Sequence, residues 1–150
     1  MTANRRFIIL LVEDEFADAA LFSELLEEIS PDIELHRVEN GQRALEFLTR
    51  APGYPQVPRP NLIVLDLNMP VMNGTEFLQR AKSSDALRSI PVLVLTTSDH
   101  PEDIQRAYHD HASGYVVKPG TYDEYHQLLK TIEAYWRGTL KLPTVEQLAR

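Results

Sequence analysis

The chain has 150 residues, of which 43% are hydrophobic and 25% charged, and this length and composition are those of one globular domain with its own core. Its formal net charge of −7 argues against binding to nucleic acid or to an anionic membrane surface. It contains no cysteine, and its N-terminal apolar run is too short for a membrane span, so we expect a soluble, cytoplasmic protein.

The first part of the chain predicts two strand–helix pairs and a loop. The apolar run Phe7–Val12 shows no alternation, which is typical of a strand buried on both faces, and a stripe of apolar residues at helical spacing follows it as far as Ile29. The segment Ile33–Val38 alternates apolar with polar residues, which predicts a strand at a sheet edge. A second helical stripe comes next, and the proline-rich segment 51–60 predicts a surface loop.

The rest of the chain predicts three more pairs. Further apolar runs without alternation indicate strands buried on both faces: Leu62–Leu65, Val92–Leu95 and Tyr115–Val117. A helical stripe follows each run. The stripe in Pro101–His111 offers only a sparse inward face, made of Ile104, Ala107 and Tyr108. The last stripe, which ends at Trp136, is strongly apolar.

This alternation predicts an α/β fold in which five parallel strands form a doubly wound sheet with helices on both faces. We assign residues 1–136 to this domain and residues 137–150 to a C-terminal extension. The extension carries four apolar residues that lie past the expected end of the domain, namely Leu140, Leu142, Val145 and Leu148.

Charged and polar residues stand where the predicted strands end. Glu13 and Asp14 end the first strand, Asp66 the third, Thr96 the fourth and Lys118 the fifth, so all meet at the sheet edge where ligands bind in such folds. Three carboxylates at one edge need a cation, and their oxygen atoms favour Mg²⁺. Asp66 is then a nucleophile that forms an acyl phosphate, with Lys118 and Thr96 facing the phosphoryl oxygens.

Each of these residues, taken singly, has a simpler explanation. Asp14 is a suitable cap for a helix that begins near Phe16, a threonine at a strand end reflects strand propensity, and a lysine before proline is usually solvated. Their joint arrival at one edge of the sheet favours a site.

Four segments are similar to the motifs of the receiver domain of two-component response regulators. They are ILLVEDE (9–15), LIVLDLNMPVMNG (62–74), PVLVLTTS (91–98) and GYVVKP (114–119). The similarity runs from about Phe7 to Trp136. It implies a flavodoxin-like receiver fold with strand order 2-1-3-4-5, in which the second and fifth strands lie at the edges.

The resemblance also implies a role for each matching residue. Asp66 is the phospho-acceptor, and the other implied roles belong to Glu13 and Asp14 (metal-binding acidic pair), Asn68 (metal ligand through its backbone carbonyl), Thr96 (switch hydroxyl), Tyr115 (switch aromatic) and Lys118 (phosphoryl-binding cation). The Lys118–Pro119 bond is expected to be cis, as is typical of the family. The implied cofactor is Mg²⁺.

The resemblance further implies a single-domain response regulator that takes its phosphoryl group from a histidine kinase in a phosphorelay and signals through a surface conformational switch. It also implies a regulatory protein that catalyses only its own phosphorylation and dephosphorylation. The long loop 51–60 and the lack of an output domain are similar to stand-alone regulators of phytochrome kinases, so a bacteriophytochrome is one candidate partner. We also expect a homodimer through the face formed by the fourth helix, fifth strand and fifth helix, because the tyrosines there and the apolar extension need a surface to cover them.

Three other functions stay open at this point. A phosphatase or phosphotransferase similar to the haloacid dehalogenase group needs a second aspartate two positions after the nucleophile, where this chain has Asn68. A flavodoxin-like module needs small uncharged residues after the first strand, where this chain has three acids at 13–15. A degenerate receiver used as a scaffold would have lost the acidic pair, the acceptor or the lysine, and all are present.

Overall fold

The computed structural model describes residues 6–54 and 56–143. A five-stranded parallel sheet with the order β2-β1-β3-β4-β5 crosses the molecule. Its strands are β1 (Ile8–Val12), β2 (Glu34–Val38), β3 (Leu62–Leu65), β4 (Val92–Thr96) and β5 (Gly114–Val117). The predicted fold class, strand order and edge strands are confirmed.

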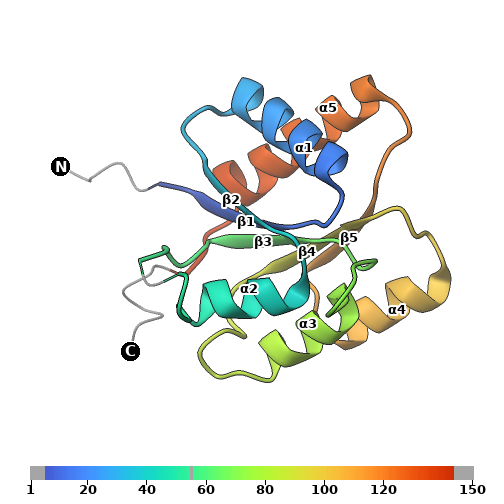
Figure 1. Cartoon of the computed structure of the whole chain (residues 1–150). Coiled ribbons are helices and arrows are strands. Elements are labelled where there is room, and N and C mark those ends of the chain that lie inside the picture. The colour runs from blue at the N-terminus through green and yellow to red at the C-terminus, as the bar shows by residue number, and fades with distance from the viewer. Residues whose placement is uncertain (1–5, 55, 144–150) are drawn as a thin grey trace.

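Helices cover both faces of this sheet (Figure 1). One layer consists of α1 and α5, and α2, α3 and α4 form the other. The bounds are α1 (Phe16–Ile29), α2 (Gly41–Leu48), α3 (Gly74–Lys82), α4 (Pro101–His109) and α5 (Tyr122–Glu133), and the helical backbone continues as a π-helix, η1 (Ala134–Thr139).

Alternate residues of the central strands build two separate cores. On β1, Leu10 and Val12 face the layer of α2, α3 and α4, whereas Ile9 and Leu11 face α1 and α5. Both faces are therefore apolar, which explains why β1, β3 and β4 have no polar alternation in the sequence. The rigid two-sided sheet fixes the positions of the residues that follow its strands.

Two predictions of burial in the C-terminal part of the sequence were wrong. The run Tyr115–Val117 was expected to be buried on both faces, but β5 is an edge strand and Val117 is 41% exposed. In α4, Tyr108 was expected to face inward, yet its side chain is exposed and Ala107 is the buried residue of that helix. Apolar residues at an edge can face water because only one neighbouring strand covers them.

The helical backbone continues beyond Trp136, which was expected to end the domain. The guanidinium of Arg137 donates to both carboxylate oxygens of Asp32 and to the hydroxyl of Ser30. Leu140 and Leu142 pack, partly buried, against the core beneath α1 and α5. These two leucines are thus partly covered by their own chain, whereas Val145 and Leu148 lie outside the described residues.

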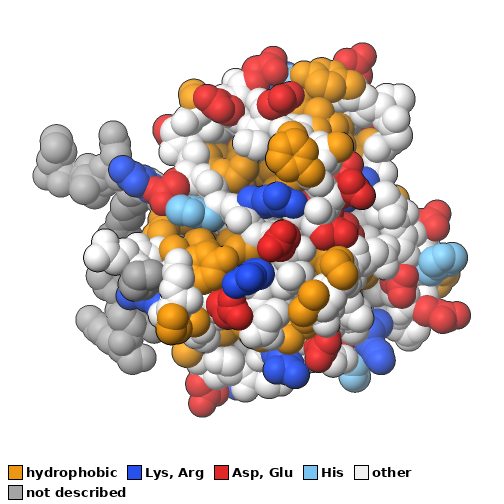
Figure 2. Space-filling view, viewed as in Figure 1, with side chains coloured by type: hydrophobic (Ala, Val, Ile, Leu, Met, Phe, Trp, Pro, Cys, Tyr) orange, Lys and Arg blue, Asp and Glu red, His pale blue; other side chains and the backbone are white. Residues whose placement is uncertain are grey.

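The surface shown in Figure 2 agrees with the acidic composition. Among the described residues on that face, basic side chains are separated from one another by acidic and apolar ones. No helix in the described part of the chain has the length and apolar character that a membrane crossing requires.

Candidate functional site

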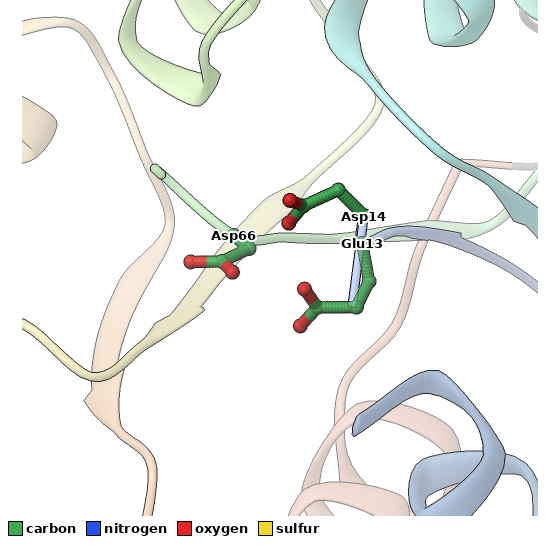
Figure 3. Close-up of side chains that lie close together, drawn as sticks. All are labelled: Glu13, Asp14 and Asp66. Atoms are coloured by element: carbon green, nitrogen blue, oxygen red, sulfur yellow. The ribbon is translucent and has the colours of Figure 1, made fainter. Parts of the chain in front are cut away.

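The site lies at the carboxyl ends of β1 and β3, where three carboxylates meet. Single oxygen atoms of Glu13, Asp14 and Asp66 lie within 4.8 Å of one another. Figure 3 shows the three side chains around a common space, Glu13 and Asp14 after β1 and Asp66 after β3. The sequence-based prediction that these acids converge is confirmed, and the donor set of hard oxygen atoms suits a divalent cation such as Mg²⁺.

The backbone that carries these acids is held by the neighbouring strands. The amide of Glu13 donates to the carbonyl of Val38 (3.0 Å), and the amide of Asp66 donates to the carbonyl of Val12 (3.0 Å). The guanidinium of Arg37 binds the carbonyls of Glu13 and Asp14 at 3.0 and 3.1 Å. The acids therefore stand on a rigid base, as a preorganised binding site requires.

Lys118 reaches the same space from the end of β5. Its ammonium lies 2.5 Å from Oε1 of Glu13 and 3.5 Å from Oδ2 of Asp66, and only 7% of its side chain is exposed. The Lys118–Pro119 bond is trans, so the expected cis bond is wrong. The trans form is the more stable one for most bonds before proline, and here it already lets the lysine reach the carboxylates.

The charges at this site are not balanced. Burial raises the pKa of Glu13 to about 7, because burial and the nearby charge of Asp66 outweigh the hydrogen bond from Lys118. Burial lowers the pKa of Lys118, but its hydrogen bonds to Glu13 and Asp18 outweigh burial and the net shift is upward. Three carboxylates, those of Glu13, Asp18 and Asp66, face this one ammonium, and the surplus of negative charge attracts a further cation.

Sequence reasoning missed Asp18 as part of this group. Its Oδ2 atom lies 2.9 Å from the ammonium of Lys118, and it stands in the first turn of α1. The available signal was its position, since it lies in the first turn of the helix that follows the acidic pair. The suggestion that Asp14 caps α1 is wrong, because Glu15 occupies the cap position and makes no side-chain capping bond.

The loop after Asp66 approaches α3 closely. The amide of Asn68 lies 3.4 Å from Oδ1 of Asp66, and Gly74 begins α3 so near to Asp66 that a Cβ atom there would lie 2.3 Å from the Asp66 carbonyl oxygen. A side chain at Gly74 would therefore displace the loop. A cavity of about 510 Å³ opens beside Asp14 and Asn68, with Asp103 of α4 on its wall.

Thr96 and Tyr115 are placed next to this site but are not joined to each other. Thr96 is fully buried, and its hydroxyl has no hydrogen-bond partner among the described residues. The hydroxyl of Tyr115 donates to the carbonyl of Ser98 (2.8 Å), and the hydroxyl of Ser98 donates to Asp103 at 2.5 Å. These bonds tie β5 and α4 to the loop that follows Thr96. A buried hydroxyl without a partner is costly, so Thr96 has an unused capacity to bind a ligand oxygen.

Comparison with known proteins gives a consistent family match. The family model described as the response regulator receiver domain matches residues 9–130. The response regulator Rcp1 of Synechocystis is 40% identical over 141 residues, which cover 94% of this chain and 96% of Rcp1.

Solved structures agree with this match. The crystal structure of the phosphorylated cyanobacterial phytochrome response regulator RcpA superposes with a TM-score of 0.89 at 37% identity, covering 93% of this chain and all of that one. The Mn²⁺-bound form of Rcp1 superposes with a TM-score of 0.86 at 39% identity, covering 92% of this chain and 99% of that one.

Proposed function

Because the chain belongs to the response regulator receiver domain family, we propose that it is a response regulator that accepts a phosphoryl group on Asp66. The observation that carries this proposal is the position of Asp66 between the acidic pair and the ammonium of Lys118. A carboxylate between a metal-binding pair and a buried cation has the surroundings that a nucleophile for phosphoryl transfer needs.

The donor in this proposal is a phosphohistidine of a histidine kinase. An oxygen atom of Asp66 attacks phosphorus, and a P–O bond forms as the P–N bond to imidazole breaks. The imidazole takes a proton from water and leaves as the neutral ring. Lys118 then pairs with a phosphoryl oxygen, since its ammonium already lies 3.5 Å from Asp66. Hydrolysis of the acyl phosphate by water returns Asp66 to its starting state.

The proposed cofactor is Mg²⁺, held by the carboxylates of Glu13, Asp14 and Asp66 and by the backbone carbonyl of Asn68. The number of charges supports a cation here, because the carboxylates of Glu13, Asp14 and Asp66 lie together and the single ammonium of Lys118 does not neutralise them. When bound, Mg²⁺ supplies positive charge that neutralises the carboxylates and the phosphoryl oxygens in transfer. The relative Rcp1 has been crystallised with Mn²⁺.

We propose that phosphorylation is reported through Thr96 and Tyr115. The hydroxyl of Thr96 gains a partner in the phosphoryl oxygen, which moves the end of β4 and the loop up to Ser98. That movement acts on Tyr115 through its bond to the Ser98 carbonyl, and its ring then fills the space that Thr96 leaves. The sparse inner face of α4, in which Ala107 is the buried residue, supports a helix able to shift.

A histidine kinase of the phytochrome class is the proposed partner. RcpA is described as a phytochrome response regulator, and a second solved relative, 33% identical, as a bacteriophytochrome response regulator. Phosphotransfer from a panel of autophosphorylated kinases of the same organism identifies the partner, and a phytochrome kinase is expected to transfer fastest.

We also propose a two-fold dimer through the face of α4, β5 and α5. These three elements carry three exposed large apolar side chains, namely Tyr108, Val117 and Tyr122, and a fourth, Tyr135, stands in η1. Leu140 and Leu142 are weaker arguments for a partner than the sequence suggested, since their own chain already covers part of each side chain. Analytical ultracentrifugation of wild type and of Tyr108→Lys decides the matter: a wild-type monomer well above micromolar concentration contradicts the dimer.

The test of phosphorylation itself uses Asp66→Asn. The amide keeps the shape of the carboxylate and loses the nucleophilic oxygen, so labelling by a kinase or by acetyl phosphate is expected to vanish while the fold persists. Glu46→Gln, at a partly exposed position of α2, serves as the control and should be labelled normally. An Asn variant that is still labelled contradicts Asp66 as the acceptor.

A further inference from the structure

Three carboxylates from three elements surround the ammonium of Lys118. Its Nζ atom lies 2.5 Å from Oε1 of Glu13, 2.9 Å from Oδ2 of Asp18 and 3.5 Å from Oδ2 of Asp66. An ammonium has three N–H donors, so each carboxylate accounts for one of them. Two of these acids also belong to the acidic cluster at the ends of β1 and β3. Asp18 does not, and its contact with Lys118 has no role in the function proposed above.

The contacts of Lys118 change when the acidic cluster takes up a divalent cation. The carboxylates of Glu13 and Asp66 then bind the cation and attract the ammonium less strongly. The cation also repels the ammonium, because both are positively charged. Either effect weakens the hold of Glu13 and Asp66 on Lys118. The ammonium would be free to move away from the site just when a phosphoryl group arrives.

Asp18 is placed to prevent this movement. Asp18 lies in the first turn of α1, where the helix dipole favours a negative charge. The next residue, Ala19, is buried in the core and holds this turn in place. The side chain of Asp18 is 41% exposed, whereas that of Lys118 is 7% exposed. Asp18 therefore remains a charged partner for the ammonium whether or not the cluster holds a cation.

We propose that Asp18 is a positioning residue that holds the ammonium of Lys118 beside Asp66 while Glu13 and Asp66 engage the metal ion. This inference rests on the proposed function, because it assigns to Asp18 the placement of the cation that meets the phosphoryl group. Asp18 does not touch the reacting atoms and acts through Lys118.

A simpler role for Asp18 is stabilisation of α1, since an acid in the first turn stabilises a helix without any partner. The two roles predict different results. A purely structural role lowers stability in Asp18→Asn but leaves Lys118 in place, whereas a positioning role changes the surroundings of the Lys118 ammonium.

The experiment compares Asp18→Asn, Asp18→Glu and the control Glu24→Gln, which changes an exposed acid on the same helix. The first measurement is the ¹⁵N signal of the Lys118 side chain, recorded with and without Mg²⁺. We expect Asp18→Asn to shift and broaden this signal, more strongly with Mg²⁺, and Glu24→Gln to leave it unchanged.

The second measurement is the rate of labelling by phosphoramidate at saturating Mg²⁺. Loss of a hydrogen bond between charged groups at a half-exposed position predicts a rate about three- to tenfold lower in Asp18→Asn. Asp18→Glu, which keeps the carboxylate, should recover most of the rate. Thermal melting of each variant confirms that it is folded.

The outcomes separate this inference from the proposed function. If wild type is labelled on Asp66 and Asp18→Asn matches Glu24→Gln in both the Lys118 signal and the rate, the role of Asp18 is wrong and the proposed function stands. If wild type is not labelled on Asp66 at all, the proposed function fails and this inference fails with it.

Discussion

Two charged clusters at different places in the fold behave in opposite ways. In the site cluster, Glu13, Asp18 and Asp66 surround the ammonium of Lys118. In the second, which we call the Arg137 cluster, the guanidinium of Arg137 binds Ser30 and Asp32 and lies 3.7 Å from Glu133. Each cluster contains a contact between distant parts of the chain, since Lys118 lies 105 positions from Glu13 and Arg137 lies 105 positions from Asp32.

The pKa shifts in the two clusters have opposite signs. Burial is the main cause that raises the pKa of Glu13 to about 7, whereas the hydrogen bond from Arg137 lowers the pKa of Asp32 to about 2. Asp32 is 66% exposed, so water and the guanidinium together stabilise its charge. In the site cluster Glu13 and Asp66 are buried, and three carboxylates face the single ammonium of Lys118. We conclude that the Arg137 cluster is complete as a structural contact, whereas the site cluster is arranged for a ligand.

The largest loss of folding stability is expected from a substitution that distorts the site cluster without altering its charge. Gly74→Ala places a Cβ atom 2.3 Å from the Asp66 carbonyl oxygen and must displace the loop that follows Asp66. Overpacking of this kind costs about 2–3 kcal/mol. Urea unfolding measures this loss, and labelling of Asp66 should fall with it. Gly120→Ala, where a Cβ atom meets nothing within 4 Å, is the control, and equal stability of the two variants would contradict the argument.

The next effect concerns the surplus charge of the site cluster. Glu13 has an ordinary pKa of 4.5 and a folded pKa of about 7, so the folded state binds the proton more readily than the unfolded state. The metal-free protein should therefore lose on the order of 1–3 kcal/mol of stability as the pH rises from about 4.5 to about 7. Urea unfolding in chelator measures this slope.

Two controls sharpen this pH experiment. Glu13→Gln should flatten the slope, because the amide does not titrate. Excess Mg²⁺ should remove it in wild type, because a cation stabilises the charged carboxylate. Stability that is independent of both pH and Mg²⁺ would show that the cluster carries no surplus charge.

Most of this fold was predictable from the sequence because both faces of its sheet are covered. Leu10 and Val12 on one face and Ile9 and Leu11 on the other make β1 an apolar run without alternation, and the same holds for β3 and β4. The carboxyl ends of such strands meet at one edge, so Glu13, Asp66 and Lys118 could be placed together. The strand order came from the family resemblance and not from periodicity.

What the sequence did not predict depends on tertiary contacts. Asp18 has no motif of its own and gains a role only because α1 brings it to Lys118. Arg137 lies 105 positions from Asp32, and nothing local in the sequence pairs them. The exposure of Val117 follows from the edge position of β5, which an apolar run does not reveal.

A smaller effect is expected at Thr96, which borders the site cluster. Its buried hydroxyl has no partner among the described residues, so Thr96→Val should stabilise the unphosphorylated protein by about 1 kcal/mol. The variant should still be labelled on Asp66 but should lose the change in hydrogen exchange that phosphorylation causes in residues 101–115. Thr96→Ser keeps the hydroxyl and should keep the response. An equal response in wild type and Thr96→Val would remove Thr96 from the switch.

The smallest change in stability is expected from a substitution in the Arg137 cluster. Asp32 has a folded pKa of about 2 and an ordinary value of 3.8, so its pairing with Arg137 contributes stability above about pH 4 that is lost as the pH falls toward 2. Arg137→Ala should lower Tm at pH 7. The difference in Tm between this variant and wild type should become smaller as the pH is lowered toward 2. Labelling of Asp66 should not change, and a clear loss of labelling would contradict a purely structural role.

The most direct test of the account locates the phosphoryl group itself. Wild-type protein is incubated with acetyl phosphate in Mg²⁺ or in excess chelator, and the intact mass and the modified peptide are determined by mass spectrometry after the acyl phosphate is trapped with borohydride. The account predicts one phosphoryl group, on Asp66, in Mg²⁺ and none in chelator. A phosphoryl group on another residue, or equal labelling in chelator, would contradict it.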